Sequence, residues 1–131
     1  MAFLADSCFY FGLNTLTTSG NAIYIISDSS GDTSTWATPT FTEATSTYAL
    51  GGASGITINA PEDRGGGGRK VAVQSVSNGN VTKNGTANKY AIVDSDNSVL
   101  LAWGALSSSQ VVTSGNSFTL TTFDIGIPDP A

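Results

Sequence analysis

Short runs of apolar residues, separated by turn-forming residues, recur along most of the chain and predict β-strands. Segment 21–27 (NAIYIIS) is rich in β-branched and aromatic residues, and a polar, turn-forming stretch follows it. Segments 88–94 and 98–106 flank the turn residues SDN and predict a hairpin, and both are apolar enough to lie centrally in a sheet. In segment 117–127 (SFTLTTFDIGI) the apolar residues keep a period of two with one shift, which predicts a strand at the end of the chain.

Two other segments predict strands with irregular features. Segment 55–61 (GITINAP) predicts a short strand that ends at Pro61. Segment 69–77 (RKVAVQSVS) places its valines on one face but changes register once, which predicts a β-bulge. Asn78–Asn80 (NGN) is a hairpin-turn signal, and it leads into segment 81–86, which holds a second Asn-Gly pair. Short strands with turns at intervals of about 8–12 residues predict an antiparallel β-sandwich or jelly roll.

Residues 1–18 predict a different element, a short amphipathic helix with Gly20 as a stop signal. This helix packs on the sheet in one interpretation and docks on a neighbouring subunit in the other. No Lys or Arg precedes Asp6, which interrupts the apolar run, so we predict no secretory signal. No stretch reaches the roughly 18 apolar residues of a membrane span. The apolar side of the helix consists of Leu4, Cys8, Phe11 and Leu16.

The length of 131 residues suits a single β domain. Only 11% of the residues are charged, against about 25% in a typical soluble domain. The polar remainder is mostly Ser, Thr, Asn and Gly, which suits a protein that is covered by neighbours or located outside the cytosol. The net charge of −5 argues against nucleic-acid binding. The predicted organisation is a helix at 1–18, a Ser/Thr/Gly-rich loop region at 28–55, a Gly-rich connection at 62–70 and the main strands at 71–127.

The cysteine and histidine counts exclude several chemistries. Cys8 is the single cysteine and the chain has no histidine, so neither an internal disulfide nor a Cys/His metal site can form. Ser-His-Asp and Cys-His catalysis are excluded for the same reason. The apolar neighbours of Cys8 predict a buried structural thiol. We therefore expect a protein that is not an enzyme and that needs no cofactor or metal.

Four consecutive glycines lie between Arg64 and Arg69 in the stretch EDRGGGGRKVAV (62–73). A phosphate-binding P-loop needs G-x-x-x-x-G-K-[ST] followed by a helix. This stretch lacks that spacing, has no Ser or Thr after Lys70 and leads into a predicted strand. We interpret the glycines as a mobile hinge that becomes ordered at an interface. Arg64, Arg69 and Lys70 are three of only five cations, and we predict that they contact acidic groups of a neighbouring subunit.

Two groups of acidic residues carry weaker signals. The stretch DSDNS (94–98) has carboxylates at alternate positions, as at the start of a calcium loop, but it lacks the glycine and glutamate of an EF-hand. Turn chemistry explains this stretch equally well. Asp28 with Asp32, or Glu43 with Glu62 and Asp63, could serve as the paired carboxylates of a glycosidase. Any chain with ten acidic residues offers such combinations, so this signal is very weak.

Aromatic residues supply further candidates for contacts. Trp36 lies in a Thr-rich loop, where it is either an exposed contact or carbohydrate-stacking residue or is buried under the loop. The full set of predicted interface residues is Phe3, Phe11, Trp36, Arg64, Arg69 and Lys70. The residues that we expect in the β core are Ile92, Leu101, Trp103, Phe118, Leu120, Phe123 and Ile125.

Segments 42–51 and 68–128 together resemble a family of small structural proteins encoded by tailed phages and prophages. The matching motifs include GRKV, GNVTKNGTA, YAIVD, LLAWGAL and VTSGNSFTLTTFDIGIP, at Gly68–Val71, Gly79–Ala87, Tyr90–Asp94, Leu100–Leu106 and Val112–Pro128. The resemblance implies a virion component, without catalytic residues and without a defined place in the particle. Segment 28–41 is less clearly matched.

This resemblance and the composition favour a capsid decoration or cement protein, which binds the major capsid protein shell of a virion assembled in the bacterial cytoplasm. The alternative is a tail, neck or fibre-base component that contacts other virion proteins or the host surface. We expect neither nucleic acid nor membrane as a partner. We also predict a closed homo-oligomer, with a trimer favoured, in which the N-terminal helix and the loop at Gly65–Gly68 lie near the contacts.

Overall fold

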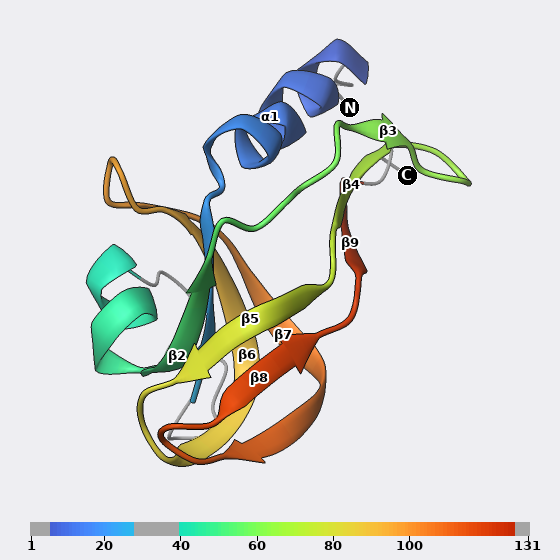
Figure 1. Cartoon of the computed structure of the whole chain (residues 1–131). Helices are drawn as coiled ribbons and strands as arrows, with labels where there is room; N and C mark the ends of the chain where they lie inside the picture. The colour runs from blue at the N-terminus through green and yellow to red at the C-terminus, as the bar shows by residue number, and fades with distance from the viewer. Residues whose placement is uncertain (1–5, 28–39, 128–131) are drawn as a thin grey trace.

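The computed structural model describes residues 6–27 and 40–127 (Figure 1). These residues form a curled antiparallel sheet of six strands, a small antiparallel sheet of three strands and one short α-helix. The all-β class with an N-terminal helix is therefore confirmed.

The six-stranded sheet follows the order β7-β6-β1-β2-β5-β8, and the small sheet follows the order β3-β4-β9. The strands of the six-stranded sheet are β1 (Ala22–Ile26), β2 (Ala49–Ser54), β5 (Val76–Val81), β6 (Gly85–Asp94), β7 (Val99–Val112) and β8 (Ser117–Leu120). The remaining elements are β3 (Glu62–Asp63), β4 (Arg69–Val73), β9 (Phe123–Ile127), the helix α1 (Asp6–Ser19) and the π-helical turn η2 (Glu43–Thr47).

Helix α1 packs mainly on β4 of the small sheet, through the buried side chains of Leu13 and Leu16. Its last turn closes with a hydrogen bond of 2.9 Å from the Gly20 amide to the Leu16 carbonyl. A Cβ atom at position 20 would lie 2.6 Å from that same carbonyl oxygen, so only glycine fits without a shift. The predicted stop at Gly20 is confirmed, and so is the interpretation that the helix packs on a sheet of its own chain.

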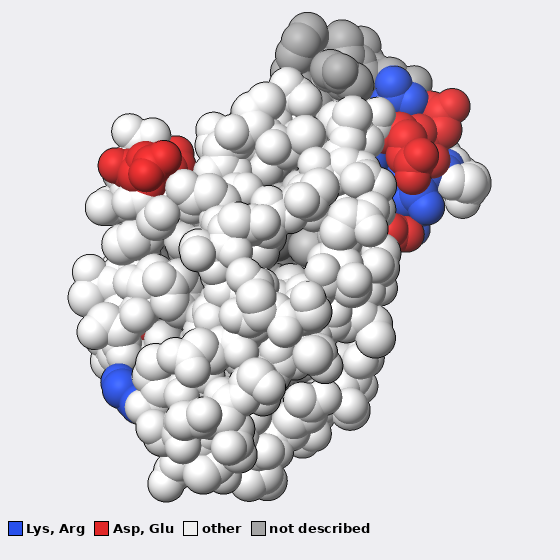
Figure 2. Space-filling model, viewed as in Figure 1, with Lys and Arg blue, Asp and Glu red and all other residues white. Residues whose placement is uncertain are grey.

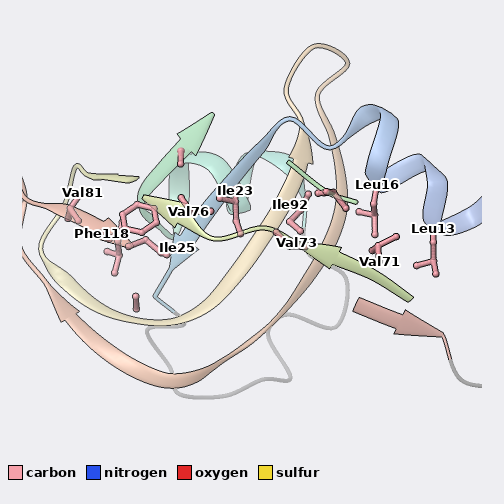
Figure 3. Close-up of a cluster of buried hydrophobic side chains, with 14 residues drawn as sticks. Leu13, Leu16, Ile23, Ile25, Val71, Val73, Val76, Val81, Ile92 and Phe118 are labelled. Carbon is pink, nitrogen blue, oxygen red and sulfur yellow. The ribbon is translucent and has the colours of Figure 1, made fainter. Parts of the chain in front are cut away.

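One hydrophobic core joins the two sheets and the helix (Figure 3). Ile23 and Ile25 enter it from β1, Val71 and Val73 from β4, and Ile92 from β6, and each is at most 2% exposed. Burial of one such side chain contributes about 1.5–3 kcal/mol. A second, smaller cluster of Ile26, Ala44 and Ala91 lies under η2.

Two segments that the sequence predicts as single strands each cross from one sheet to the other. Segment 69–77 divides into β4, in the small sheet, and β5, in the six-stranded sheet. Segment 117–127 divides into β8 and β9 in the same way. The register change that predicts a bulge in segment 69–77 is thus a passage between sheets, and that prediction is wrong. Gln74 stabilises the chain where it passes between the sheets, because its backbone amide donates a 2.9 Å hydrogen bond to the Thr57 backbone carbonyl.

Three other local predictions are also wrong. The NGN stretch at 78–80 is not a turn but part of β5, where Gly79 lies directly opposite the Phe118 ring. Segment 55–61 is not a strand, and it forms only an isolated bridge between Ile58 and Val73. The loop region predicted at 28–55 contains η2 and the interior strand β2, while residues 28–39 lie outside the described residues.

The hairpin predicted around SDN is confirmed as β6 and β7, but only β6 is central. β7 is an outer strand of the six-stranded sheet, so its predicted central position is wrong. Trp103 on β7 is 45% exposed and does not belong to the core. Of the other predicted core residues, Ile92 and Phe118 are buried. Those that are only partly buried are Leu101, Leu120, Phe123 and Ile125.

Candidate interaction surfaces

The glycine-rich stretch forms the turn of a hairpin between β3 and β4. The Gly67 amide donates to the Arg64 carbonyl at 2.9 Å, and the Arg64 amide donates to the Gly68 carbonyl at 3.1 Å. The φ angles of Gly66, Gly67 and Gly68 are 105°, 107° and 86°, a region that favours glycine. The stretch is thus a hydrogen-bonded turn that leads into β4, and its mobility and its ordering at an interface stay predictions.

Arg69 and Lys70, two of the three cations around this turn, have acidic partners in their own chain. Arg69 pairs with Asp63, directly opposite it on β3. The Lys70 Nζ atom lies 3.2 Å from Asp124 Oδ2 and 3.8 Å from Glu62 Oε1. These carboxylates are more than half exposed, so each pair contributes at most about 1 kcal/mol.

The third cation, Arg64, makes no ion pair within the described residues. Its guanidinium donates to the Gly67 carbonyl at 3.3 Å, and its side chain lies over Gly126 of β9. Together with Asp124, the hairpin 62–70 forms a charged tip of three cations and three carboxylates, at one end of the molecule (Figure 2). Of the predicted basic contacts, Arg64 keeps the most capacity for an acidic partner.

The predicted aromatic contacts are placed only in part. Phe3 and Trp36 lie outside the described residues. Phe11 lies in α1, where the structure describes the backbone. These three positions therefore stay predictions.

The acidic stretch 94–98 forms the tight turn between β6 and β7. The Asp94 carboxylate accepts hydrogen bonds from the amides of Asp96 (3.1 Å) and Asn97 (3.3 Å) and from the Asn97 side chain (2.8 Å). The Asn97 side-chain bond is the main cause that lowers the pKa of Asp94; burial opposes this shift, and the two backbone bonds add to it. Asn21 fixes the turn to β1, because its Oδ1 atom accepts from the Ser95 amide at 2.9 Å.

These hydrogen bonds explain the acidic stretch 94–98 as a turn between two strands. Among the side chains that the structure describes, no three acidic groups gather closely enough to hold a metal ion. Of the other acidic pairs drawn from the sequence, Asp28 and Asp32 lie outside the described residues. Glu43 accepts hydrogen bonds from the amide and hydroxyl of Thr40.

Unlike the charged tip, strands β7 and β8 carry no charged side chains. Residues 97–123 contain no Asp, Glu, Lys or Arg, which makes them the longest uncharged run in the chain. β7 and β8 are the two outer strands of the six-stranded sheet, so one side of each carries backbone groups without a strand partner in the described part of the chain. Val99, Trp103 and Val111 of β7 are 44%, 45% and 83% exposed. We call β7 and β8 the uncharged face, and part of it lies in the white area of Figure 2.

A groove runs along this face between β7 on one side and β8 and β9 on the other. One pocket of about 280 Å³ lies between residues 105–107 on one side and Leu120, Thr121, Phe123 and Asp124 on the other, and Tyr90 also lines it. A second of about 260 Å³ continues along β7 to Gln110 and shares Leu106 and Leu120 with the first. Each is smaller than the roughly 300–1,000 Å³ of a typical small-molecule site. The shared residues make the two pockets one continuous groove.

Aromatic and aliphatic side chains line the groove. The rings of Tyr90 and Phe123 meet at a centroid distance of 4.8 Å and an angle of 53°. Burial raises the pKa of the Tyr90 hydroxyl above its ordinary value. Leu106, Leu120 and Phe123 pack against the core but are only partly buried, whereas the core residues of β1 and β4 are fully buried. The core is thus incompletely covered on the side of β7, β8 and β9.

Sequence reasoning did not identify this surface. Its apolar strands predict a central place in the sheet, because apolar composition alone does not distinguish an interior strand from an exposed one. The run of residues without charge at 97–123 was the signal that could have revealed it.

Comparison with known proteins adds no relative: no protein-family model, no curated protein and no solved structure matches the chain. The helices in the described residues are all too short or too polar to cross a membrane. The described structure therefore defines a small all-β domain with a charged tip and an uncharged face.

Proposed function

We propose that this chain is a structural protein of a bacteriophage virion, and specifically a decoration or cement protein that binds the major capsid protein shell. Such a protein acts through contacts and not through catalysis. The proposal starts from the resemblance of segments 42–51 and 68–128 to small phage structural proteins. The observation that carries it furthest is the uncharged face, whose outer strands and partly exposed apolar residues suit contact with other protein chains.

The rest of the molecule supports the same role. One continuous core joins both sheets and α1, so the domain can fold without a partner. The core that the two sheets share supports the finer prediction of a β-sandwich, which we retain as a proposal. In the virion we expect a closed homo-oligomer, with a trimer favoured, that presents the uncharged face and the charged tip to its neighbours.

The number of copies in a purified particle tests this proposal. We expect quantitative mass spectrometry to find on the order of hundreds of copies per particle, because a decoration protein repeats with the shell lattice. About a dozen copies or fewer would indicate the tail, neck or fibre-base role instead. Particles without the chain, from cells that express it, would overturn both roles.

A binding experiment locates the protein on the particle. Purified protein is added to particles that lack it because its gene has been deleted from the genome. The bound copies are then imaged by electron microscopy. A regular array on the shell supports decoration, and label confined to the tail or neck contradicts it.

A further inference from the structure

We infer that the groove between β7 and β8 binds one extended, uncharged segment of the shell protein, which pairs with the open edges of the sheet as an added strand. The inference rests on the proposed function. It names the kind of contact that holds this protein on the shell and the chemistry of the segment that makes it.

The two open edges of the six-stranded sheet face a single space. β7 and β8 are the two ends of the strand order, so one side of each has no strand partner in the described part of the chain (Figure 1). A third pocket of about 240 Å³, between residues 110–113 and residues 116–119, continues the groove and shares Gln110 and Thr119 with the second. One segment in this groove reaches both edges, and its backbone supplies the donors and acceptors that they lack.

A bulge in β7 lies beside the groove. Between its pairs at Gln110 and Ala105, β7 has four residues where β6 has only Asn88. Three of these four, residues 106–108, line the groove. A bulge interrupts regular pairing and re-aims side chains. We therefore expect the segment to pair with β8 and with residues 110–112 of β7, and to place a side chain beside the bulge.

The pocket beside the bulge suits an apolar side chain. Leu106, Leu120 and Phe123 line it, and they are only partly buried although they pack against the core. The Tyr90 ring, which packs against Phe123, lines it as well. An apolar side chain placed here removes these groups from water, which favours association. When a strand is added to a sheet, main-chain hydrogen bonds supply affinity and side-chain pockets of this kind supply specificity.

The groove is uncharged along most of its length. Residues 97–123 carry no charged side chain, and Asp124, at one end of the groove, lies 3.2 Å from Lys70 Nζ. A charged side chain that enters between β7 and β8 loses water and gains no counter-ion from residues 97–123, which costs free energy. The segment that binds best is therefore uncharged.

The segment belongs to a different protein and not to a second copy of this chain. The longest uncharged run of the chain, residues 97–123, is already built into β7, β8 and the start of β9, so it is not free to act as the segment. Each copy also carries a net charge of −5, which opposes the approach of a second copy.

A synthetic peptide tests the groove without particles. The probe is a capped, uncharged peptide in which threonine and valine alternate around a central leucine. We expect saturable binding to the full chain, with the amides of residues 110–112 and 117–120 protected from hydrogen exchange. A control peptide with proline at two of its threonines should not bind, because proline has no amide hydrogen. Main-chain pairing depends little on sequence, so a probe that does not bind at millimolar concentration overturns the inference.

Neighbouring serines on β7 provide matched variants. Ser108 and Ser109 are both exposed, and Ser108 lines the groove whereas Ser109 does not. Ser108→Glu and Ser108→Lys should each raise the dissociation constant of the peptide about tenfold or more, and the same changes at Ser109 should alter it less than about twofold. Equal melting temperatures show that the variants fold. Opposite effects of Glu and Lys at Ser108 would overturn the uncharged segment, because they indicate a charged one.

Binding to particles that lack the protein separates this inference from the proposed function. Both Ser108 variants should bind the shell more weakly than the Ser109 variants, and equal binding overturns the inference while the proposed function stands. A wild type that binds no particle but binds the peptide overturns the proposed function and leaves the groove as a strand-binding site. Self-association of the wild type that both Ser108 variants lose overturns the choice of partner, because a second copy then fills the groove.

Discussion

Gly79→Ala is a direct test of how β5 and β8 pack in the core. Gly79 lies opposite Phe118 in the β5–β8 pairing, and the Phe118 side chain belongs to the buried core. A Cβ atom at position 79 would lie 2.5 Å from Cε1 and Cζ of that ring and 2.6 Å from Cδ1. No real Cβ contact is this short, so the ring must move. Phe118 is only 5% exposed, which leaves it little room to do so.

The expected cost follows from two opposing effects. Overpacking of a well-packed core costs about 1–3 kcal/mol, and partial exposure of the displaced ring loses part of the roughly 3 kcal/mol gained by its burial. Ala is better than Gly in a strand by about 0.5–1 kcal/mol, and the φ angle of Gly79 is not positive, so the backbone itself accepts Ala. We expect a net loss of about 1–3 kcal/mol in the free energy of unfolding, measured by urea denaturation.

Gly12→Ala is the matched control. Gly12 lies in α1, is exposed and has no atom within 4 Å of the place that an added Cβ would take, so Ala should stabilise the helix by about 0.5–1 kcal/mol. Phe118→Leu should restore part of the loss in Gly79→Ala, because a smaller side chain leaves space for the new methyl group. A Gly79→Ala protein as stable as the wild type would refute the close contact between Gly79 and the ring.

Three further predictions concern the turns and the charged tip. Hydrogen bonds lower the pKa of the Asp94 carboxylate in the folded protein. The ionised carboxylate therefore stabilises the fold above its unfolded pKa of about 3.9, and this stabilisation is lost as the pH falls through the lower folded pKa. Between pH 7 and pH 3 the melting temperature should therefore fall less in Asp94→Asn than in the wild type. Ser98→Gly should raise the free energy of unfolding by about 1 kcal/mol, because Ser98 has a φ angle of 57°, and an unchanged urea midpoint would contradict this. Arg64→Ala should leave the melting temperature unchanged and weaken binding to particles more at low salt than at high salt, whereas equal binding at both would exclude an acidic partner.

The sequence predicts elements well where neighbouring residues decide them. β1 and the β6–β7 hairpin lie where the apolar pattern and the turn residues place them. Gly20 ends α1 because the requirement for glycine comes from the helix's own carbonyl groups. In each case the determining contacts lie within the element or its nearest neighbour.

The wrong predictions concern contacts between distant segments. A one-residue change of register looks the same in the sequence whether a strand bulges or passes to another sheet, and at Gln74 the partner that decides is Thr57. The NGN stretch has the local signature of a turn, but Gly79 is required by Phe118, which comes much later in the chain.

The burial of strand β7 is also decided by contacts that the sequence does not specify. This strand gives the strongest reason to expect a partner. Its apolar sequence predicts burial, and nothing in a sequence specifies whether the covering atoms belong to the same chain. Single exposed apolar residues are common on protein surfaces and need no explanation. Here Val99 and Trp103 lie on an outer strand and inside the longest uncharged run of the chain. A second protein chain that covers them would meet no charged side chain of residues 97–123.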